Sequence, residues 1–286
     1  MMNFKKIRFV TDSTCDIPPE LLQKHNITVV PCYINYGNQS YADDSKELVR
    51  EDFYQTLQSV HPSPTTAAPS PGDCKSAIES AFKDADHVVI VSVATKLSGT
   101  NNALRLGAAD FPPDRVTLLD SQTTSMGLGW QVVLGAETAE MTGNVQQTVD
   151  TVQRVQKHTH VYCALQTLEF LRRSGRVGWA AAGIGALLQI KPILHVFNGE
   201  VNQGSRVRTF SRAVDEMVRL CHTHAPLDRL AIMHAINPEG ALDLQNRLAD
   251  ISPPDTIIVS ITPTIGTHIG PGGLGLAPVS KLWRTT

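Results

Sequence analysis

Val89-Ile-Val-Ser-Val-Ala-Thr-Lys-Leu-Ser98-Gly99-Thr100 predicts a buried β-strand that runs directly into the start of a helix. The β-branched residues from Val89 to Val93 favour the strand, and the small residues after it are typical of a helix start. Backbone N–H groups are free at the first turn of a helix, so the stretch predicts an anion site beyond the carboxyl end of a strand. Alternatively, Ser98 or Thr100 only caps the helix.

Similar strand and helix segments alternate through the first half of the chain. Pro18-Pro19-Glu20 and Pro71-Gly72-Asp73 each place a proline in the first turn of a predicted helix, the second after a loop at 61–70. Such alternation predicts a parallel sheet that is covered by helices on both faces. The predicted strands are 7–11, 27–33, 87–93 and 115–119.

The second half of the chain follows a different pattern. Asn198-Gly199 predicts a hairpin, because a type I′ turn requires positive φ at both central positions. We therefore expect an α/β protein with two domains: an N-terminal parallel-sheet domain of three layers over residues 1–165, and a smaller α+β domain over residues 166–286. The remaining predicted helices are 125–141, 145–157, 168–173, 212–222 and 238–248, and the remaining predicted strands are 161–165, 230–234 and 257–262.

Composition excludes several classes of protein. The 25 basic and 27 acidic residues give a formal net charge of -2, so nothing favours binding to nucleic acid. The five cysteines form no C-x-x-C pair, which is typical of a reducing compartment, so we expect a cytoplasmic protein. The sequence shows neither a signal peptide nor a run of about eighteen apolar residues, so we expect a protein that is not integral to a membrane.

A glycine-rich stretch near the C-terminus, Thr264-Ile-Gly-Thr-His-Ile-Gly-Pro-Gly-Gly-Leu-Gly275, places His268 among glycines. Its last glycines match the G-x-G-x-x-G pattern of dinucleotide-binding folds, but the eleven residues that follow leave no room for the helix and acidic residue of those folds. We predict instead a loop in which glycines allow a ligand to approach closely and the imidazole donates a hydrogen bond to an anion. The alternative is a tight turn with a structural histidine.

Two more polar segments are candidates for binding. The Pro-rich segment 64–71 holds Thr66 in a stiff, extended loop, where its hydroxyl either points at a ligand or is merely solvated. The segment Thr11-Asp12-Ser13-Thr14-Cys15-Asp16 follows the first strand. It fits either a site for a hard cation or a turn closed by Asp12 in which Asp16 caps the next helix.

Three segments later in the chain allow both structural and functional interpretations. Arg176 lies just past the glycine that ends a helical run, and it either belongs to a C-terminal turn or faces a phosphate or a partner protein. The segment 179–188 is either a core helix or a close-packed backbone that leaves room for a slender ligand. His158-Thr-His160 and His222-Thr-His224 are weak metal motifs without nearby cysteines or carboxylates, so we expect no metal site.

In their order and spacing these segments resemble the DegV family of bacterial fatty-acid-binding proteins, the carrier subunits of fatty acid kinase. The similarity covers nearly the whole chain. It rests on Val10-Thr-Asp-Ser-Thr-Cys-Asp16, Thr66 to Gly72, Leu97-Ser-Gly-Thr100, Leu119-Asp-Ser121, Leu168 through Arg176, and Ile265-Gly-Thr-His-Ile-Gly-Pro-Gly272.

The resemblance implies that a long-chain fatty acid such as palmitate, stearate or oleate lies in a tunnel between sheet and helices. The chain departs from the family pattern at Ala67 and Ala68, where polar residues are common, so contacts beside the head group are expected to differ. The implied carboxylate-binding residues are Thr66, Ser98 and His268, with Gly99, Thr100, Thr267, Gly270 and Gly272 as supporting loop residues. The implied partner- or phosphate-facing residues are Arg176 and Arg208, with Arg206 as an alternative to Arg208.

The resemblance further implies a lipid carrier that has no cofactor and catalyses nothing by itself. Its partners would be an ATP-dependent fatty acid kinase with a dihydroxyacetone-kinase-like domain and a downstream acyltransferase of phospholipid synthesis, with an acyl-phosphate passed between them. One alternative is a serine esterase or acyltransferase that uses Ser98 and His268, although the flanking glycines of G-x-S-x-G are absent. Another is an interaction protein without a ligand.

Overall fold

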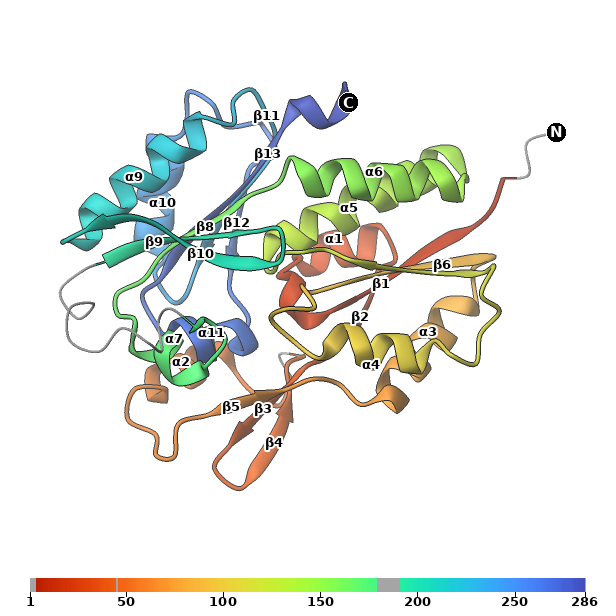
Figure 1. Ribbon diagram of the computed structural model, residues 1–286, viewed down its shortest axis with the longest axis horizontal. Coiled ribbons are helices and arrows are strands. Elements are labelled where there is room, and N and C mark those ends of the chain that lie inside the picture. The colour runs from red at the N-terminus through yellow and green to blue at the C-terminus, as the bar shows by residue number, and fades with distance from the viewer. Residues whose placement is uncertain (1–3, 45, 179–190, 286) are drawn as a thin grey trace.

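The computed structural model describes residues 4–44, 46–178 and 191–285, and it builds them into two larger sheets and one small sheet (Figure 1). The first sheet has the strand order β2-β1-β6-β7, and every pairing within it is parallel. The predicted parallel sheet is therefore confirmed. Its strands are β1 (Ile7–Asp12), β2 (Thr28–Val30), β6 (His87–Ser92) and β7 (Val116–Asp120).

Helices cover both faces of this first sheet, as expected for strands that are apolar on both sides. All six residues of β6 are buried. Helices α3 (Pro71–Phe82) and α4 (Thr100–Gly107) pack on one face, and α5 (Met126–Thr142) packs on the other, with α6 (Val145–Lys157) behind it. The predicted start of α3 is confirmed, because Ser70 and Asp73 form a reciprocal capping box in front of it.

The second sheet has six strands in the order β10-β9-β8-β13-β11-β12, and it is mixed: only β11 and β12 pair in parallel. Helices α9 (Phe210–His222) and α10 (Pro238–Arg247) cover its outer face. The strands are β8 (Val161–Ala164), β9 (Lys191–Phe197), β10 (Glu200–Val207), β11 (Leu227–His234), β12 (Ile257–Ser260) and β13 (Leu274–Ser280).

Helix α5 lies between the two large sheets. Every residue from Met126 to Ala136 is buried, as expected for a helix that is apolar all round. Trp130 joins α5 to the second sheet, since its Nε1 donates a hydrogen bond to the carbonyl of Ala277 at 3.1 Å. Strand β8 belongs to the second sheet although it precedes residue 166, and the division of the chain at 165/166 remains a prediction.

A third, three-stranded sheet was not expected from the sequence. The predicted strand 27–33 is wrong as one element, because Pro31 cannot donate a ladder hydrogen bond and the chain leaves the first sheet there. The predicted loop 61–70 contains a strand that returns to pair with β3. This part of the molecule comprises α1 (Pro19–Lys24), β3 (Tyr33–Tyr36), β4 (Gln39–Ala42), α2 (Arg50–Thr56) and β5 (Thr65–Ala67).

The glycine-rich stretch near the C-terminus is not the loop that the sequence suggested. Pro263–Ile269 form helix α11, and His268 lies in its last turn. The chain then turns through Gly270 and Gly272, whose φ angles of 74° and 79° favour glycine, and enters β13. A proline in the first turn starts the helix in spite of the glycines. The remaining short elements are η1 (Ser13–Cys15), α7 (Glu169–Ser174) and η3 (Lys281–Arg284).

The hairpin predicted at Asn198-Gly199 is confirmed. The two residues join β9 to β10 with φ angles of 51° and 78°, as a type I′ turn requires. The hairpin tip contacts the first half of the chain, because the N–H of Gly199 donates to the carbonyl of Gln122 at 2.7 Å. The hairpin therefore forms one wall between the two large sheets.

Candidate functional site

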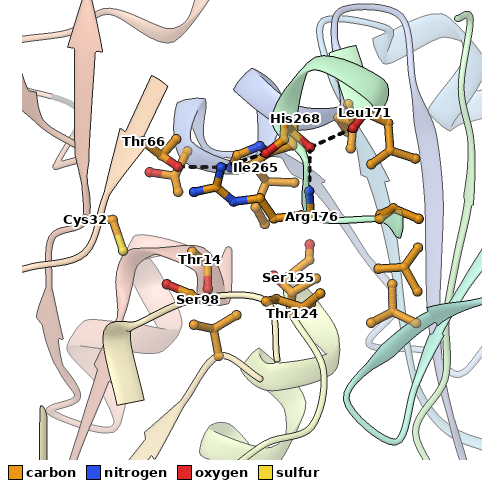
Figure 2. Close-up of a pocket in the computed structure, with 18 of the residues that line it drawn as sticks. Thr14, Cys32, Thr66, Ser98, Thr124, Ser125, Leu171, Arg176, Ile265 and His268 are labelled. Atoms are coloured by element: carbon orange, nitrogen blue, oxygen red, sulfur yellow. Dashed lines mark hydrogen bonds between the residues drawn. The ribbon is translucent and has the colours of Figure 1, made fainter. Parts of the chain in front are cut away.

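A cavity of about 640 Å³ lies where the two large sheets and the small sheet meet (Figure 2). This volume falls within the range of roughly 300–1,000 Å³ that is usual for small-molecule sites. Residues from every part of the chain line it, from Thr14 in η1 to Gly275 in β13. The predicted lining segment 179–188 lies outside the described residues.

Several polar side chains line this cavity. The Thr66 hydroxyl, on β5, and Nε2 of His268, on α11, are 3.0 Å apart. Ser98 lines the same cavity from the loop before α4, and its hydroxyl lies 2.8 Å from that of Thr100. The structure thus brings together three residues that are far apart in the sequence. Their role in binding a carboxylate remains a prediction.

His268 is an uncharged group in this setting. Burial first, and then the nearby positive charge of Arg176, lower the pKa of its imidazole to about 4. Nδ1 is buried and has no hydrogen-bond partner among the described residues, whereas Nε2 faces Thr66. A neutral imidazole carries a single N–H, so the ring can donate one hydrogen bond at neutral pH.

Arg176 also lines the cavity, and it is exposed to solvent. Helix α7 ends at Gly175, whose φ of 68° allows the chain to turn, and Nη1 of Arg176 donates to the carbonyl of Ser174 at 2.7 Å. Arg208, in contrast, is exposed just after β10 and is not part of the cavity lining. The structure therefore places only the first of these two arginines at the site.

The rest of the cavity is largely apolar. The cavity-facing residues of the second sheet form its floor, and residues of α7 and α11 cover it. Ala67 and Ala68, the two departures from the family pattern, line the wall beside Thr66. The apolar lining comprises Val93, Leu97, Val161, Leu171, Val177, Leu194, Val196, Val201, Met233, Ile261, Ile265 and Ile269.

The predicted supporting residues lie at different depths. Gly99 lines the cavity, and the N–H of Thr100, at the start of α4, donates to the Ser98 hydroxyl at 3.2 Å. Thr267 is turned away, because its hydroxyl donates to the carbonyl of Pro263 at 2.9 Å within α11. Gly270 and Gly272 shape the turn behind the site, and a Cβ on the former would lie 2.3 Å from the ring of Phe170.

The acidic segment after β1 is structural. Asp12 accepts hydrogen bonds from the N–H of Thr14 at 3.1 Å and from the N–H of Val93 at 2.8 Å, so the Asx-type turn is confirmed. Asp16 does not cap the next helix. It accepts from the N–H of Thr262 at 2.8 Å and from the Ser125 hydroxyl, which ties three distant segments together. In the described part of the chain, no cluster of three or more His, Cys, Asp or Glu side chains could hold a metal ion.

Several lining residues carried no signal in the sequence. Cys32, Thr124 and Ser125 also line the cavity, as Figure 2 shows, and Met233 belongs to the same lining. Ser125 is distinguished only in three dimensions, by a φ of 53° and a ψ of -147° at the start of α5. Such an unusual backbone conformation in a non-glycine residue is common at functional sites.

The sequence matches one protein-family model, described as an uncharacterised protein of the DegV family, over residues 6–281. Among curated proteins, a DegV domain-containing protein of Deinococcus radiodurans is 34% identical over 276 residues, which cover 95% of this chain and 97% of the relative. One from Streptomyces coelicolor is 32% identical and covers 97% of this chain and 99% of the relative.

Solved structures share the fold. A structure described as fatty acid binding of a DegV family protein from Thermus thermophilus is 30% identical, with a TM-score of 0.87, over 96% of this chain and 99% of the other. A fatty acid binding protein, DegV, from Bacillus subtilis is 26% identical with a TM-score of 0.84, over 97% of this chain and 100% of the other. No helix in the described part of this chain has the length and apolar character needed to cross a bilayer.

Proposed function

This chain belongs to the DegV family, and we propose that it binds one long-chain fatty acid, such as palmitate, stearate or oleate, in the cavity between its sheets. The observation that carries the proposal is a cavity of about 640 Å³ that is lined mainly by apolar side chains and also by Thr66, Ser98 and His268. Related proteins are described as fatty acid binding, which supports the same ligand class.

The polar end of the cavity suits a carboxylate. The Thr66 and Ser98 hydroxyls and the neutral imidazole of His268 can each donate one hydrogen bond. A hydrogen bond to a charged group contributes about 1.5–3 kcal/mol, so three such bonds offset much of the cost of removing a carboxylate from water. Because these three donors are uncharged, the carboxylate keeps its nucleophilic character.

The apolar part of the cavity provides the driving force. Transfer of about 14 methylene groups from water releases at most about 11 kcal/mol, at about 0.8 kcal/mol each. Association itself costs an estimated 4–15 kcal/mol, so tight binding requires that the tail be fully enclosed. Apolar side chains of the second sheet, α7 and α11 line the cavity and give the tail surfaces to pack against.

We further propose that the protein presents the carboxylate to an ATP-dependent fatty acid kinase, holds the resulting acyl-phosphate, and delivers it to an acyltransferase. Arg176 supports this step, since it is exposed and lines the cavity near His268. A guanidinium at that position can pair with phosphate oxygens. Arg208 lies outside the cavity lining, where it is available to a partner protein.

The geometry does not favour the esterase alternative. A serine nucleophile needs a base within hydrogen-bond reach. In the described part of the chain Ser98 pairs with Thr100, and Nε2 of His268 pairs with Thr66 instead. We therefore expect no labelling of Ser98 by a fluorophosphonate probe.

Native mass spectrometry and lipid extraction test the binding proposal. The purified protein should carry a single long-chain fatty acid, and the double variant Ser98→Ala with His268→Ala should lose it on washing. His222→Ala is the matched control, because His222 lies at the end of α9, outside the cavity lining. A wild-type protein without lipid, or a double variant with unchanged lipid content, would contradict the proposal.

The kinase step is tested separately with loaded protein, ATP and the kinase subunit of a bacterial fatty acid kinase. Hydroxylamine converts an acyl-phosphate to a hydroxamate, which mass spectrometry detects. We expect Arg176→Ala to lower hydroxamate formation while the bound lipid is retained, and Arg208→Ala to lower it only at limiting kinase concentration. If the wild-type protein binds lipid but forms no hydroxamate, the protein binds fatty acids but does not present them to the kinase.

A further inference from the structure

The floor of the cavity is a row of four residues on adjacent strands. Leu194 on β9 pairs with Cys163 on β8, Cys163 pairs with Gly275 on β13, and Gly275 pairs with Met233 on β11. All four line the cavity. Neighbouring strands lie about 4.8 Å apart, so the row crosses roughly 14 Å of floor. A ligand tail that runs along the cavity must lie against at least part of it.

Gly275 is the low point of this row. Every residue of β13 is buried, and a glycine inside such a strand often marks a place where another group approaches the backbone closely. A Cβ at this position would lie 2.9 Å from Cε of Met233 and 3.2 Å from the carbonyl oxygen of Tyr162. The terminal methyl group of Met233 therefore lies over the notch that the glycine leaves.

Met233 is the adjustable part of the floor. Its unbranched side chain has three rotatable bonds and can change shape at little cost. The sulfur lies 2.9 Å from the Ser125 hydroxyl, which also contacts the Asp16 carboxylate. A hydroxyl carries a single hydrogen, so Ser125 cannot donate to both acceptors at once, and the sulfur is the weaker one. The thioether is therefore held loosely over the glycine.

We propose that Met233 and Gly275 together determine which acyl chains the cavity accepts. The inference rests on the proposed fatty acid function and adds its chain specificity. With Met233 over the notch the floor is flat and suits a straight chain. When the side chain moves aside, the exposed notch at Gly275 admits the bend of a cis-unsaturated chain.

Two substitutions change the depth of the floor in opposite directions. Met233→Ala removes the group over the notch and deepens the floor, which favours bent chains. Gly275→Ala places a methyl group 2.9 Å from Cε of Met233, too close for an ordinary contact, and drives that side chain into the cavity, which favours straight chains. We expect the bound oleate-to-palmitate ratio to rise by about tenfold in the first variant and to fall by about tenfold in the second, the lower end of what one methylene contributes to discrimination in an apolar pocket.

The experiment exchanges the bound lipid for an equimolar mixture of palmitate, stearate and oleate and measures what each purified variant retains by gas chromatography. Met217→Ala is the matched control, because Met217 is equally buried but packs on the opposite face of the same sheet. Thermal melting verifies that each variant is folded. If Gly275→Ala does not fold, the graded pair Met233→Val and Met233→Ala decides the matter, with the larger rise expected for alanine.

The possible outcomes distinguish a failure of the proposed chain specificity from a failure of the proposed fatty acid binding. If the wild type and all variants bind lipid with the composition of Met217→Ala, the floor does not set specificity and this inference is overturned. If the wild type retains none of the three acids, the proposed function fails and the inference fails with it. Opposite shifts in the two variants with an unchanged control would support the inference.

Discussion

Hydroxyl and imidazole groups at the head of the cavity depend on one another. The Thr66 hydroxyl and Nε2 of His268 are 3.0 Å apart, and the low pKa of the histidine, caused first by burial, keeps the imidazole neutral. A ligand carboxylate would compete for the same hydrogens. Residue types were predictable here, because threonine in a stiff Pro-rich segment and histidine among glycines both suggested polar groups facing a ligand. Their contact could not be predicted, since 202 positions separate them and a local sequence pattern carries no information about contacts at that separation.

Replacement of Thr66 by valine tests the hydroxyl alone, because valine keeps the branched shape. We expect Thr66→Val to weaken fatty acid binding by about 10- to 100-fold, which corresponds to the loss of one hydrogen bond of about 1.5–3 kcal/mol to a charged group. Thr66→Ser retains the hydroxyl and should bind within about threefold of the wild type, a difference below 1 kcal/mol. Isothermal titration calorimetry with palmitate measures both. Equal affinities for the valine and serine variants would rule out a direct contact.

At the scale of elements, the β9–β10 hairpin forms one end of the cavity floor. It supplies Leu194, Val196 and Val201 to the lining. Its tip is joined to the first half of the chain by the hydrogen bond from Gly199 to Gln122 and by an exposed ion pair between Lys96 and Glu200. The ion pair is worth at most about 1 kcal/mol, so the hairpin depends mainly on its turn and on the pairing of β9 with β10.

The turn can be tested by substitution of its glycine. Gly199 has a φ of 78°, and a residue with a Cβ in that region costs about 1–2 kcal/mol, so Gly199→Ala should lower the free energy of unfolding by that amount. Gly72→Ala is the matched control, because Gly72 lies in α3, where alanine should be neutral or stabilising by up to about 1 kcal/mol. Urea denaturation measures both changes. A Gly199→Ala protein as stable as the wild type would show that the hairpin does not depend on this turn.

Element patterns also explain which parts of the fold the sequence could predict. Strands with β-branched runs and helices with proline or capping residues at their start were found, because their signals are local. The small sheet was missed, since β3 and β5 pair across the 28 residues between Tyr36 and Thr65 and neither strand has a clear apolar alternation. Helix α11 was taken for a loop because glycine content outweighed the proline that starts it.

At the scale of the whole molecule, the site exists only where three sheets meet. Thr66 comes from the small sheet, Ser98 from the loop between β6 of the first sheet and α4, and His268 from α11, which lies between β12 and β13 of the second sheet. Sequence motifs identified each of these residues through family resemblance. The floor residues Met233 and Gly275 are ordinary positions in buried strands, and only the register of β8, β11 and β13 places them side by side.

A group of uncharged histidines lies on the outer face of the second sheet. Nδ1 of His160 is 2.9 Å from Nε2 of His195, and the ring of His160 stacks on those of His224 and Phe197 at 4.1 Å and 4.4 Å. Burial first, and then the neighbouring histidines, lower the pKa of His160 to about 3; burial also lowers the pKa values of His195 and His224. The stack therefore requires neutral rings.

This histidine stack predicts a loss of stability in acid. An unfolded histidine has a pKa of about 6.5, so below that pH the unfolded chain binds protons that folded His160, His195 and His224 exclude, and the free energy of unfolding falls as the pH drops. Asp16 acts in the opposite direction: burial raises its pKa to about 6, so the folded state gains relative stability as that carboxyl takes up a proton below pH 6. Burial likewise raises the pKa values of Asp12 and Asp43, but it also lowers those of four further histidines, His87, His158, His234 and His268. Because the histidines with lowered pKa values outnumber the carboxyls with raised ones, we expect the melting temperature to decrease between about pH 6.5 and pH 4.5.

His160→Phe separates the stack from other causes of acid sensitivity. A phenyl ring keeps the stacking surface between Phe197 and His224 but cannot take up a proton, so the melting temperature of the variant should depend less steeply on pH below about 6.5 than that of the wild type. His61→Phe, at an exposed position, should leave the wild-type slope unchanged. Scanning calorimetry of the three proteins in the same buffers decides the question. Equal slopes for wild type and His160→Phe would mean that the acid sensitivity arises elsewhere, with buried His268 as the next group to substitute, because the pKa of its imidazole is lowered to about 4 in the folded protein.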